Sequence, residues 1–309
     1  MRPAPYFDDV AAGPPGGEAV WAPAGDADVR VALWPSALAR ETVLIFPGRT
    51  EYVEKYSAVA RDLHAAGFAV AAVDWRGQGL TERPRRNRMS GHVRDFADFQ
   101  RDADAMVQAT RVAGMPQAFH MVAHSMGGLI GLGSLMRGLP IARAAFSAPM
   151  WGLPLAPPRR LAAQVISAIG HRMGLGEAAT PGSGKVADPA NAPFEGNLLT
   201  TDRETFGWMR AQFQAHPELA LGAPSLSWLR AAFREMREVA ALPSPATATV
   251  TWLGTDERIV DAGAIRSRMA RWPAGELIEV SGGRHEVLME TPALRGPVMD
   301  RLVAHLRGT

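Results

Sequence analysis

The sequence predicts an α/β fold in which a mostly parallel sheet is covered by helices on both faces, and three observations support this. Short apolar runs bounded by turn residues recur along the 309-residue chain, with helix-like stretches between them. Polar residues that could carry chemistry follow these runs, where open α/β sheets place their sites. The alternation stops at about Trp151 and resumes near Thr247, which indicates an inserted segment.

The strand candidates begin with EAVWA and VRVALW, which are expected to form an N-terminal hairpin. The remaining candidates, in chain order, are TVLIF from Thr42, FAVAAVD ending at Asp74, AFHMVA ending at Ala123, ARAAFSAP, ATVTWLG ending at Gly254, and ELIEVSGG. Between strands, stretches such as KYSAVARDLHAAG have helical spacing and a closing glycine, Gly67, that favours a helix C-cap.

Residues 151–240 are predicted to form a helical cap, or lid, inserted after the sixth predicted strand. Residues 1–150 and 241–309 would then form the core domain. The first helix of the inserted cap carries an apolar stripe that is expected to pack on the core: Leu161, Val165, Ile169 and Met173. Long insertions in compact domains usually serve a function, so we expect this one to cover a site.

Composition excludes several classes of function. The chain has no cysteine, which removes disulfides, thiolate metal sites and a cysteine nucleophile. The net charge is only +2, and the one dense basic cluster, Arg83, Arg85, Arg86 and Arg88, does not indicate nucleic-acid binding. The N-terminus lacks the pattern of a signal peptide, and no apolar run reaches the roughly 20 residues of a membrane span. We therefore expect a soluble, cytoplasmic protein without metal or cofactor; the sequence does not indicate its oligomeric state.

The segment MVAHSMGGLIGL, residues 121–132, has the pattern of a nucleophile elbow between a strand and a helix. Ser125 is the candidate nucleophile, and the residues two before and two after it, Ala123 and Gly127, are small, as a strained turn requires. Alanine replaces the usual first glycine of the motif. The helix that follows would direct its free N–H groups at the site, so the Met126 amide is a candidate oxyanion donor.

Two later strands are followed by residues that could complete a catalytic triad in the order serine, acid, histidine. His285 follows ELIEVSGG and would take the Ser125 proton, and Asp256 follows ATVTWLG and would orient its imidazole. Glu257 and Asp261 remain open as alternatives for the acid. His124 lies beside the serine, but neighbouring residues on a tight turn project differently, and we interpret it as structural.

The second oxyanion donor is expected from the loop after TVLIF, which reads Pro47-Gly48-Arg49-Thr50. The Arg49 amide is the candidate, and Thr50 is the alternative. The glycine-rich loop at 75–79 is too short a signal for a nucleotide site, and a tight turn is the interpretation we favour for it.

Together these motifs carry a family resemblance. The stretches FPGRTEYVEKY, VDWRGQGLTERP, VAHSMGG, GTDERIVD and GGRHEVLME resemble the α/β-hydrolase superfamily, in its bacterial lysophospholipase and monoacylglycerol lipase-like branch, from Thr42 to the C-terminus. The resemblance implies a Ser125, Asp256, His285 triad and a Pro-Gly-Arg oxyanion stretch ending at Arg49. It also implies a serine hydrolase that cleaves a carboxylic ester of a single-chain acyl lipid, most closely a lysophospholipase.

Several alternatives remain at this stage. A monoacylglycerol lipase, a general carboxylesterase or a serine peptidase would share the chemistry, and a non-catalytic binding module would share the fold. Arg159, Arg160 or the Arg83–Arg88 cluster could contact a phosphate head group. The substrate class also predicts peripheral contact with a membrane, at its inner face.

Overall fold

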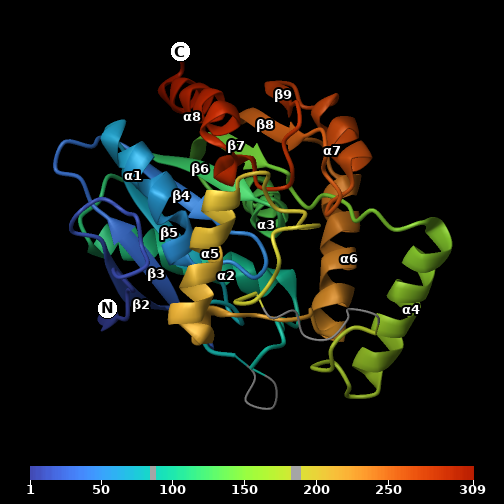
Figure 1. The fold of residues 1–309 in the computed structure, drawn as a ribbon. Coiled ribbons are helices and arrows are strands. Elements are labelled where there is room, and N and C mark those ends of the chain that lie inside the picture. Colours follow the sequence, from blue (N-terminus) through green and yellow to red (C-terminus); the bar gives the residue numbers. More distant parts are fainter. Residues whose placement is uncertain (84–87, 182–188) are drawn as a thin grey trace.

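The computed structural model describes residues 1–83, 88–181 and 189–309. Its described strands form one sheet in the order β1-β2-β3-β5-β4-β6-β7-β8-β9, shown in Figure 1. The strands are β1 Arg2–Ala4, β2 Glu18–Pro23, β3 Asp28–Trp34, β4 Thr42–Phe46, β5 Ala69–Asp74, β6 Phe119–His124, β7 Ile141–Ser147, β8 Ala248–Gly254 and β9 Gly275–Val280. From β5 to β9 neighbours in the sheet run parallel, whereas β1, β2 and β3 add in antiparallel fashion. The predicted fold class is confirmed.

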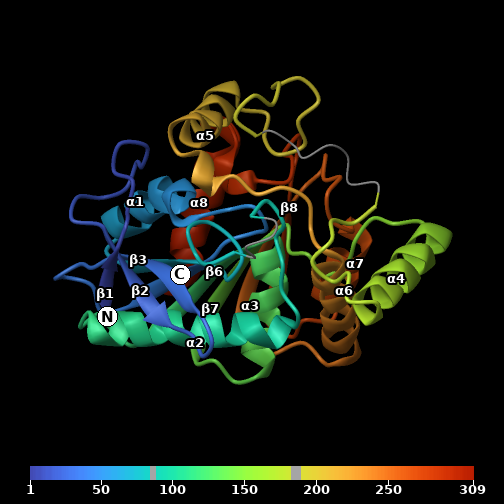
Figure 2. The same ribbon diagram turned by 90° about the horizontal axis from the view of Figure 1, so that it is seen from below.

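The described helices are α1 Ser57–Ala65, α2 Phe96–Val112, α3 Met126–Met136, α4 Pro157–Arg172, α5 Arg203–Ala215, α6 Leu226–Ala241, α7 Ala262–Met269 and α8 Pro292–Arg307. Three short 3-10 helices also occur: η1 Val53–Tyr56, η2 Pro217–Leu219 and η3 Val287–Met289. Side chains of α1 and α8 form the core on one face of the sheet, and those of α2, α3, α6 and α7 form the core on the other. Figure 2 shows α1 and α2 on opposite sides of the strands.

One strand was not predicted from the sequence. The three-residue β1 pairs with β2 at the edge of the sheet, and it is too short to produce an apolar pattern. The sixth predicted strand is therefore β7, and the inserted segment follows it as expected. Its helices α4, α5 and α6 all lie between β7 and β8 in the chain.

The central strands are buried on both faces because helices cover both sides of the sheet, which explains their continuous apolar runs. Every residue of β4, β5 and β6 is buried. In the register, Phe46 lies beside Ala123, and Ala123 lies beside Phe146. The loops that leave β4, β6 and β7 therefore emerge together at one edge of the sheet.

Helix α4 departs from the sequence-based expectation. Its predicted stripe does not pack on the core: Leu161, Ile169 and Met173 are 62%, 51% and 69% exposed. The helix instead packs on α6 through small residues; a Cβ at Gly170 would lie 2.5 Å from the Leu226 side chain. Both figures show α4 projecting from the body of the protein. No helix in the described parts of the chain is both long and apolar enough to cross a membrane.

Candidate active site

Ser125 lies at a strained turn between β6 and α3. Its backbone has φ 50° and ψ −117°, in the left-handed half of φ that residues with a side chain rarely adopt. The turn approaches the strand β4 so closely that a Cβ at Gly127 would lie 2.0 Å from the Phe46 carbonyl oxygen. Only glycine fits there. The backbone thus has the geometry of the predicted elbow.

The turn is fixed by hydrogen bonds to the neighbouring strand and loop. The Ser125 N–H donates to the Ser147 carbonyl at 3.0 Å, and the Ser125 carbonyl accepts from Met150 N–H at 2.8 Å. The Met126 amide begins α3 and makes no hydrogen bond within the described residues. It is therefore free to receive a developing negative charge.

His285 pairs with Glu257, which corrects the choice of Asp256 as its partner. The Nδ1 atom of His285 lies 2.7 Å from Oε2 of Glu257, and both side chains are almost fully buried. The Asp256 side chain is exposed, and its carboxylate has no hydrogen bond among the described residues. Glu257 was the alternative kept open by the sequence, and Asp261 instead caps the N-terminus of α7 through the Ala264 N–H.

The path of the chain after β8 explains this correction. A Cβ at Gly254 would lie 2.3 Å from the carbonyl oxygens of Gly283 and Arg284, so the loops after β8 and β9 are in close contact. The turn closes with Glu257 N–H donating to the Gly254 carbonyl at 3.2 Å, which leaves Asp256 on the solvent side. Glu257 comes one residue later, and its longer side chain reaches back to the histidine.

Glu257 is held in place and kept ionised. Its Oε1 accepts hydrogen bonds from the N–H groups of Ile259 at 2.6 Å and Val260 at 3.0 Å. Burial acts to raise the pKa of the Glu257 carboxyl, but the hydrogen bond and charge of His285, with the two backbone donors, outweigh it, so the pKa is lowered. A carboxylate on Nδ1 leaves Nε2 as the nitrogen available to Ser125.

The loop after β4 supplies the second candidate oxyanion donor. The Arg49 amide makes no hydrogen bond within the described residues, whereas the Thr50 amide donates to Oε1 of Gln78 at 3.1 Å. Thr50 has φ 68°, so the loop is strained at this position. The Thr50 amide is occupied, and this leaves Arg49 as the candidate.

The loop at 75–79 makes the tight turn expected from its glycines, with Gly77 at φ 80° and Gly79 at φ 52°, and it also contacts the loop after β4. The Trp75 indole donates to the Pro47 carbonyl at 2.8 Å, and the Gln78 amide donates to the Gly48 carbonyl at 3.0 Å. These bonds fix the loop that carries the Arg49 amide. Their partners lie 28 and 30 residues earlier in the chain, so no local sequence signal could reveal them.

A buried ionic cluster lies beneath this loop and joins it to the histidine loop. The Lys55 ammonium lies 2.7 Å from both Glu51 and Glu286, and the Tyr56 hydroxyl donates to Glu51 at 2.7 Å. The Gly48 N–H also donates to Glu51. Burial acts to raise the pKa of Glu51, but Lys55, then His124, lower it to about 2. Glu51 therefore ties the oxyanion loop, through Lys55, to Glu286 beside His285.

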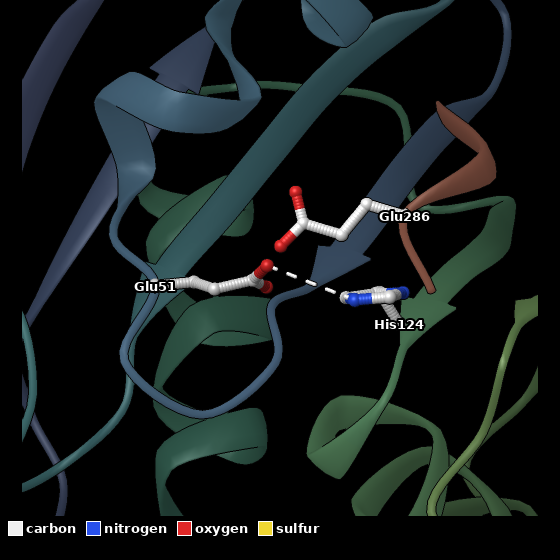
Figure 3. A group of neighbouring side chains, drawn as sticks. All are labelled: Glu51, His124 and Glu286. Carbon is white, nitrogen blue, oxygen red and sulfur yellow. Dashed lines mark ion pairs between the residues drawn. The ribbon is translucent and has the colours of Figure 1, made fainter. Parts of the chain in front are cut away.

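His124 borders this cluster, and its contacts indicate the structural role expected from the sequence. Its Nδ1 lies 3.0 Å from the Ser147 carbonyl, and burial lowers its pKa to about 3, which keeps the ring neutral. Figure 3 shows its ring beside the converging carboxylates of Glu51 and Glu286, whose ligand atoms lie within 4.8 Å of one another and of a His124 nitrogen. Such a trio could bind a metal ion, but Lys55 already supplies the positive charge between the two carboxylates.

Ser125 and His285 open into one cavity of about 550 Å³. This volume lies within the range of about 300 to 1,000 Å³ that is typical of small-molecule sites. The lining is mainly apolar and comes from both the sheet edge and the inserted helices, with Met150, Leu153, Leu199, Phe206, Met209, Phe213, Leu221, Trp228, Leu229, Ile259 and Val260 among its residues. An elongated apolar group can be enclosed beside the serine.

Comparisons with known proteins identify the family of this chain. The family model described as "Serine aminopeptidase, S33" matches residues 37–292. The chain belongs to the S33 family. Lysophospholipase L2 of Escherichia coli K12 is 29% identical over 296 residues, which cover 93% of this chain and 86% of that protein. The probable lysophospholipase L2 of Haemophilus influenzae is 26% identical, with 86% and 84% covered.

Solved structures show the same fold. A soluble variant of monoglyceride lipase from Saccharomyces cerevisiae superposes with a TM-score of 0.74 at 20% identity, over 99% of each chain. A carboxyl esterase from Bacillus coagulans has a TM-score of 0.75 at 16% identity, over 94% of this chain and 97% of that one. The resemblance to the α/β-hydrolase branch and the predicted enzyme class, a lysophospholipase-like serine ester hydrolase, are confirmed for this S33 member.

Proposed function

We propose that this S33 hydrolase cleaves the acyl ester of a lysophospholipid through an acyl-enzyme formed on Ser125. The observation that carries the proposal is the apolar cavity into which the strained serine and the His285–Glu257 pair both open. The similarity to the lysophospholipase L2 proteins supports the same substrate. Each acyl methylene buried in such a cavity contributes about 0.8 kcal/mol to binding.

The proposed reaction has two halves. Oγ of Ser125 attacks the ester carbonyl carbon while Nε2 of His285 takes its proton, and the amides of Met126 and Arg49 bind the oxyanion. Collapse breaks the bond to the glycerol oxygen, which leaves with the proton from His285. Water then attacks the acyl-enzyme by the same path and releases the fatty acid. Glu257 stabilises the imidazolium that forms in each half.

Residues 151–240 would act as the cap of this site, with residues 1–150 and 241–309 as the core domain. Phe206 and Met209 of α5 and Trp228 of α6 line the cavity, so the insertion supplies part of the acyl-binding wall. Opening of this cap would give the substrate its route to Ser125. Cytoplasmic location remains part of the proposal.

We further propose that α4 contacts the membrane that holds the substrate. Its outward face exposes Ile166 in addition to the stripe that contains Val165, and three arginines lie at its two ends: Arg159, Arg160 and Arg172. An apolar helix face with flanking cations is typical of helices that bind an anionic membrane surface. Replacement of Leu161 and Ile169 by serine should reduce co-sedimentation with phosphatidylglycerol vesicles. Unchanged binding of this variant would contradict the role of α4.

Monoacylglycerols are the second candidate substrate, because the mainly apolar cavity would take the same acyl chain with a neutral glycerol. The test is fatty-acid release from a lysophospholipid and a monoacylglycerol of matched chain length, with Ser125→Ala as the control. Faster release from the lysophospholipid, lost in the variant, supports the proposal. Equal or faster release from the monoacylglycerol would favour the second candidate.

A further inference from the structure

The Arg49 side chain is a half-buried cation whose Nε atom is fully buried and which has no carboxylate partner in the described chain. No carboxylate forms an ion pair with it among the described residues, and its Nε is buried without a hydrogen-bond partner. Burial alone lowers the pKa of the Arg49 guanidinium to about 10, so it remains charged at neutral pH. Partial removal of this charge from water costs free energy, which an anionic ligand would offset.

The buried arginines of the described chain each have several hydrogen-bond or ion-pair partners. Arg30 and Arg76 pair with carboxylates. Arg83 donates to the carbonyls of Gly79, Arg88, Glu218, Leu219 and Ala220. Arg268 donates to the Leu242 and Val239 carbonyls. Arg49 has a single such bond, from Nη2 to the Gly222 carbonyl at 2.5 Å.

The sequence-based candidates for a phosphate contact do not match this pattern. Arg83 is occupied by carbonyls, and Arg159 and Arg160 are exposed on α4, away from the cavity lining. Arg85 and Arg86 lie outside the described residues. Arg49 was considered only for its backbone amide, because a sequence cannot show that its side chain lacks a partner.

The Arg49 guanidinium is also held in place at the wall of the cavity that contains Ser125. Its central carbon lies 5.5 Å from the centre of the Trp228 ring, and Nη2 is anchored on Gly222. A Cβ at Gly91 would lie 3.0 Å from Nη2, so the backbone of Gly91 closes this edge. Nη1 makes no hydrogen bond within the described residues. Arg49, Trp228, Gly222 and Ser125 all line the same cavity, so a ligand there meets a positioned donor.

We propose that the Arg49 side chain binds a phosphodiester oxygen of the substrate head group while the acyl ester lies at Ser125. This inference rests on the proposed function and makes Arg49 the residue that distinguishes a lysophospholipid from a neutral monoacylglycerol. A guanidinium suits phosphate because its planar donors match the oxygen geometry and its bonds are charge-assisted. The Arg49 backbone amide can still serve the oxyanion when the side chain is changed.

Binding of ether analogues tests this without depending on turnover, because ester hydrolysis cannot cleave them. Dissociation constants would be measured by calorimetry for an octyl ether lysophospholipid, octyl glycerol ether and octanoate, below their micellar concentrations. Arg49→Gln should raise the dissociation constant of the lysophospholipid analogue by about 10-fold or more and leave that of the glycerol ether unchanged. Arg49→Lys should restore part of the lost affinity for the lysophospholipid analogue. Arg160→Gln, on the exposed helix α4, should leave the dissociation constants of all the ligands unchanged.

Three results would overturn the inference. If Arg49→Gln weakened the binding of both ethers equally, the side chain would only support the loop around Gly222. No change for either ether would show that the charge is not used. Weakening confined to octanoate would assign the site to a carboxylate. Failure of the proposed function is separate, because it would appear as absent ester hydrolysis in the wild type whatever these ethers do.

Discussion

Arg30 and Arg49 lie in two regions of this protein that use an arginine in opposite ways. At the antiparallel edge of the sheet, Arg30 is fully buried, with Nε 2.7 Å from Asp74 and Nη1 2.7 Å from Glu54. In the catalytic cavity, Arg49 has no carboxylate partner among the described residues. Burial lowers the pKa of both guanidiniums, but Asp74 and Glu54 more than reverse this for Arg30. In the first region the arginine is paired with carboxylates of the protein, and in the second we propose that it pairs with a ligand.

The largest expected effect concerns the chemistry of the cavity region. Ser125→Ala should lower ester turnover by about 10⁴-fold or more, because no other group would form the acyl-enzyme. The measurement is kcat on a soluble ester, with a thermal melt to show that the variant is folded. Turnover within 10-fold of wild type would place the chemistry elsewhere.

Glu257 and Asp256 give a matched pair of neighbouring acids in the same region. Glu257→Gln should reduce kcat by about 10³- to 10⁴-fold, since the imidazolium at His285 loses its carboxylate. Asp256→Asn should leave kcat nearly unchanged, because its side chain is exposed. Steady-state kinetics on one ester decide between them. A larger loss for Asp256→Asn would mean that the observed pair is not the catalytic one.

Replacing each of the two arginines should change the free energy of unfolding by different amounts. Arg30→Met leaves Asp74 and Glu54 buried without their partner, so it should lower the free energy of unfolding by about 3 to 5 kcal/mol. Arg49→Met removes an unpaired charge and should lower it by about 1 kcal/mol or less. Urea denaturation of both variants tests the comparison. Similar losses would mean that Arg49 is structural after all.

A further expected effect is the acid sensitivity of His124, which borders the cluster beneath the oxyanion loop. The His124 pKa is about 3 in the folded protein, below the ordinary value of 6.5, so the unfolded chain binds the extra proton between these pH values. Stability should therefore fall as pH decreases from 6.5 towards 3, by at most about 1.4 kcal/mol per pH unit for this group.

His124→Asn should flatten that slope, because asparagine can donate to the Ser147 carbonyl without titrating. Thermal melts between pH 4 and 7 measure the slope in both proteins. An identical slope in the variant would assign the acid sensitivity to other groups. Glu51 contributes at lower pH, where protonation from its ordinary range down to about 2 removes its bonds to Lys55 and Tyr56.

Features set by local sequence could be predicted, and features set by long-range contacts could not. The alternating strands and the strained turn at Ser125 follow from residues close together in the chain. The choice between Asp256 and Glu257 depends on contact between the loops after β8 and β9. The periodic stripe of α4 correctly indicated a helix, but periodicity does not show what a face contacts. The Lys55 cluster joins residues more than 230 positions apart, beyond any local pattern.

The most direct test of the catalytic assignment is labelling with an alkyl fluorophosphonate, followed by mass spectrometry of the modified peptide. We expect one adduct, on Ser125, formed about 10³-fold more slowly in Glu257→Gln and at the wild-type rate in Asp256→Asn. An adduct on another residue, or a rate that depends on Asp256 and not on Glu257, would contradict the triad of Ser125, His285 and Glu257.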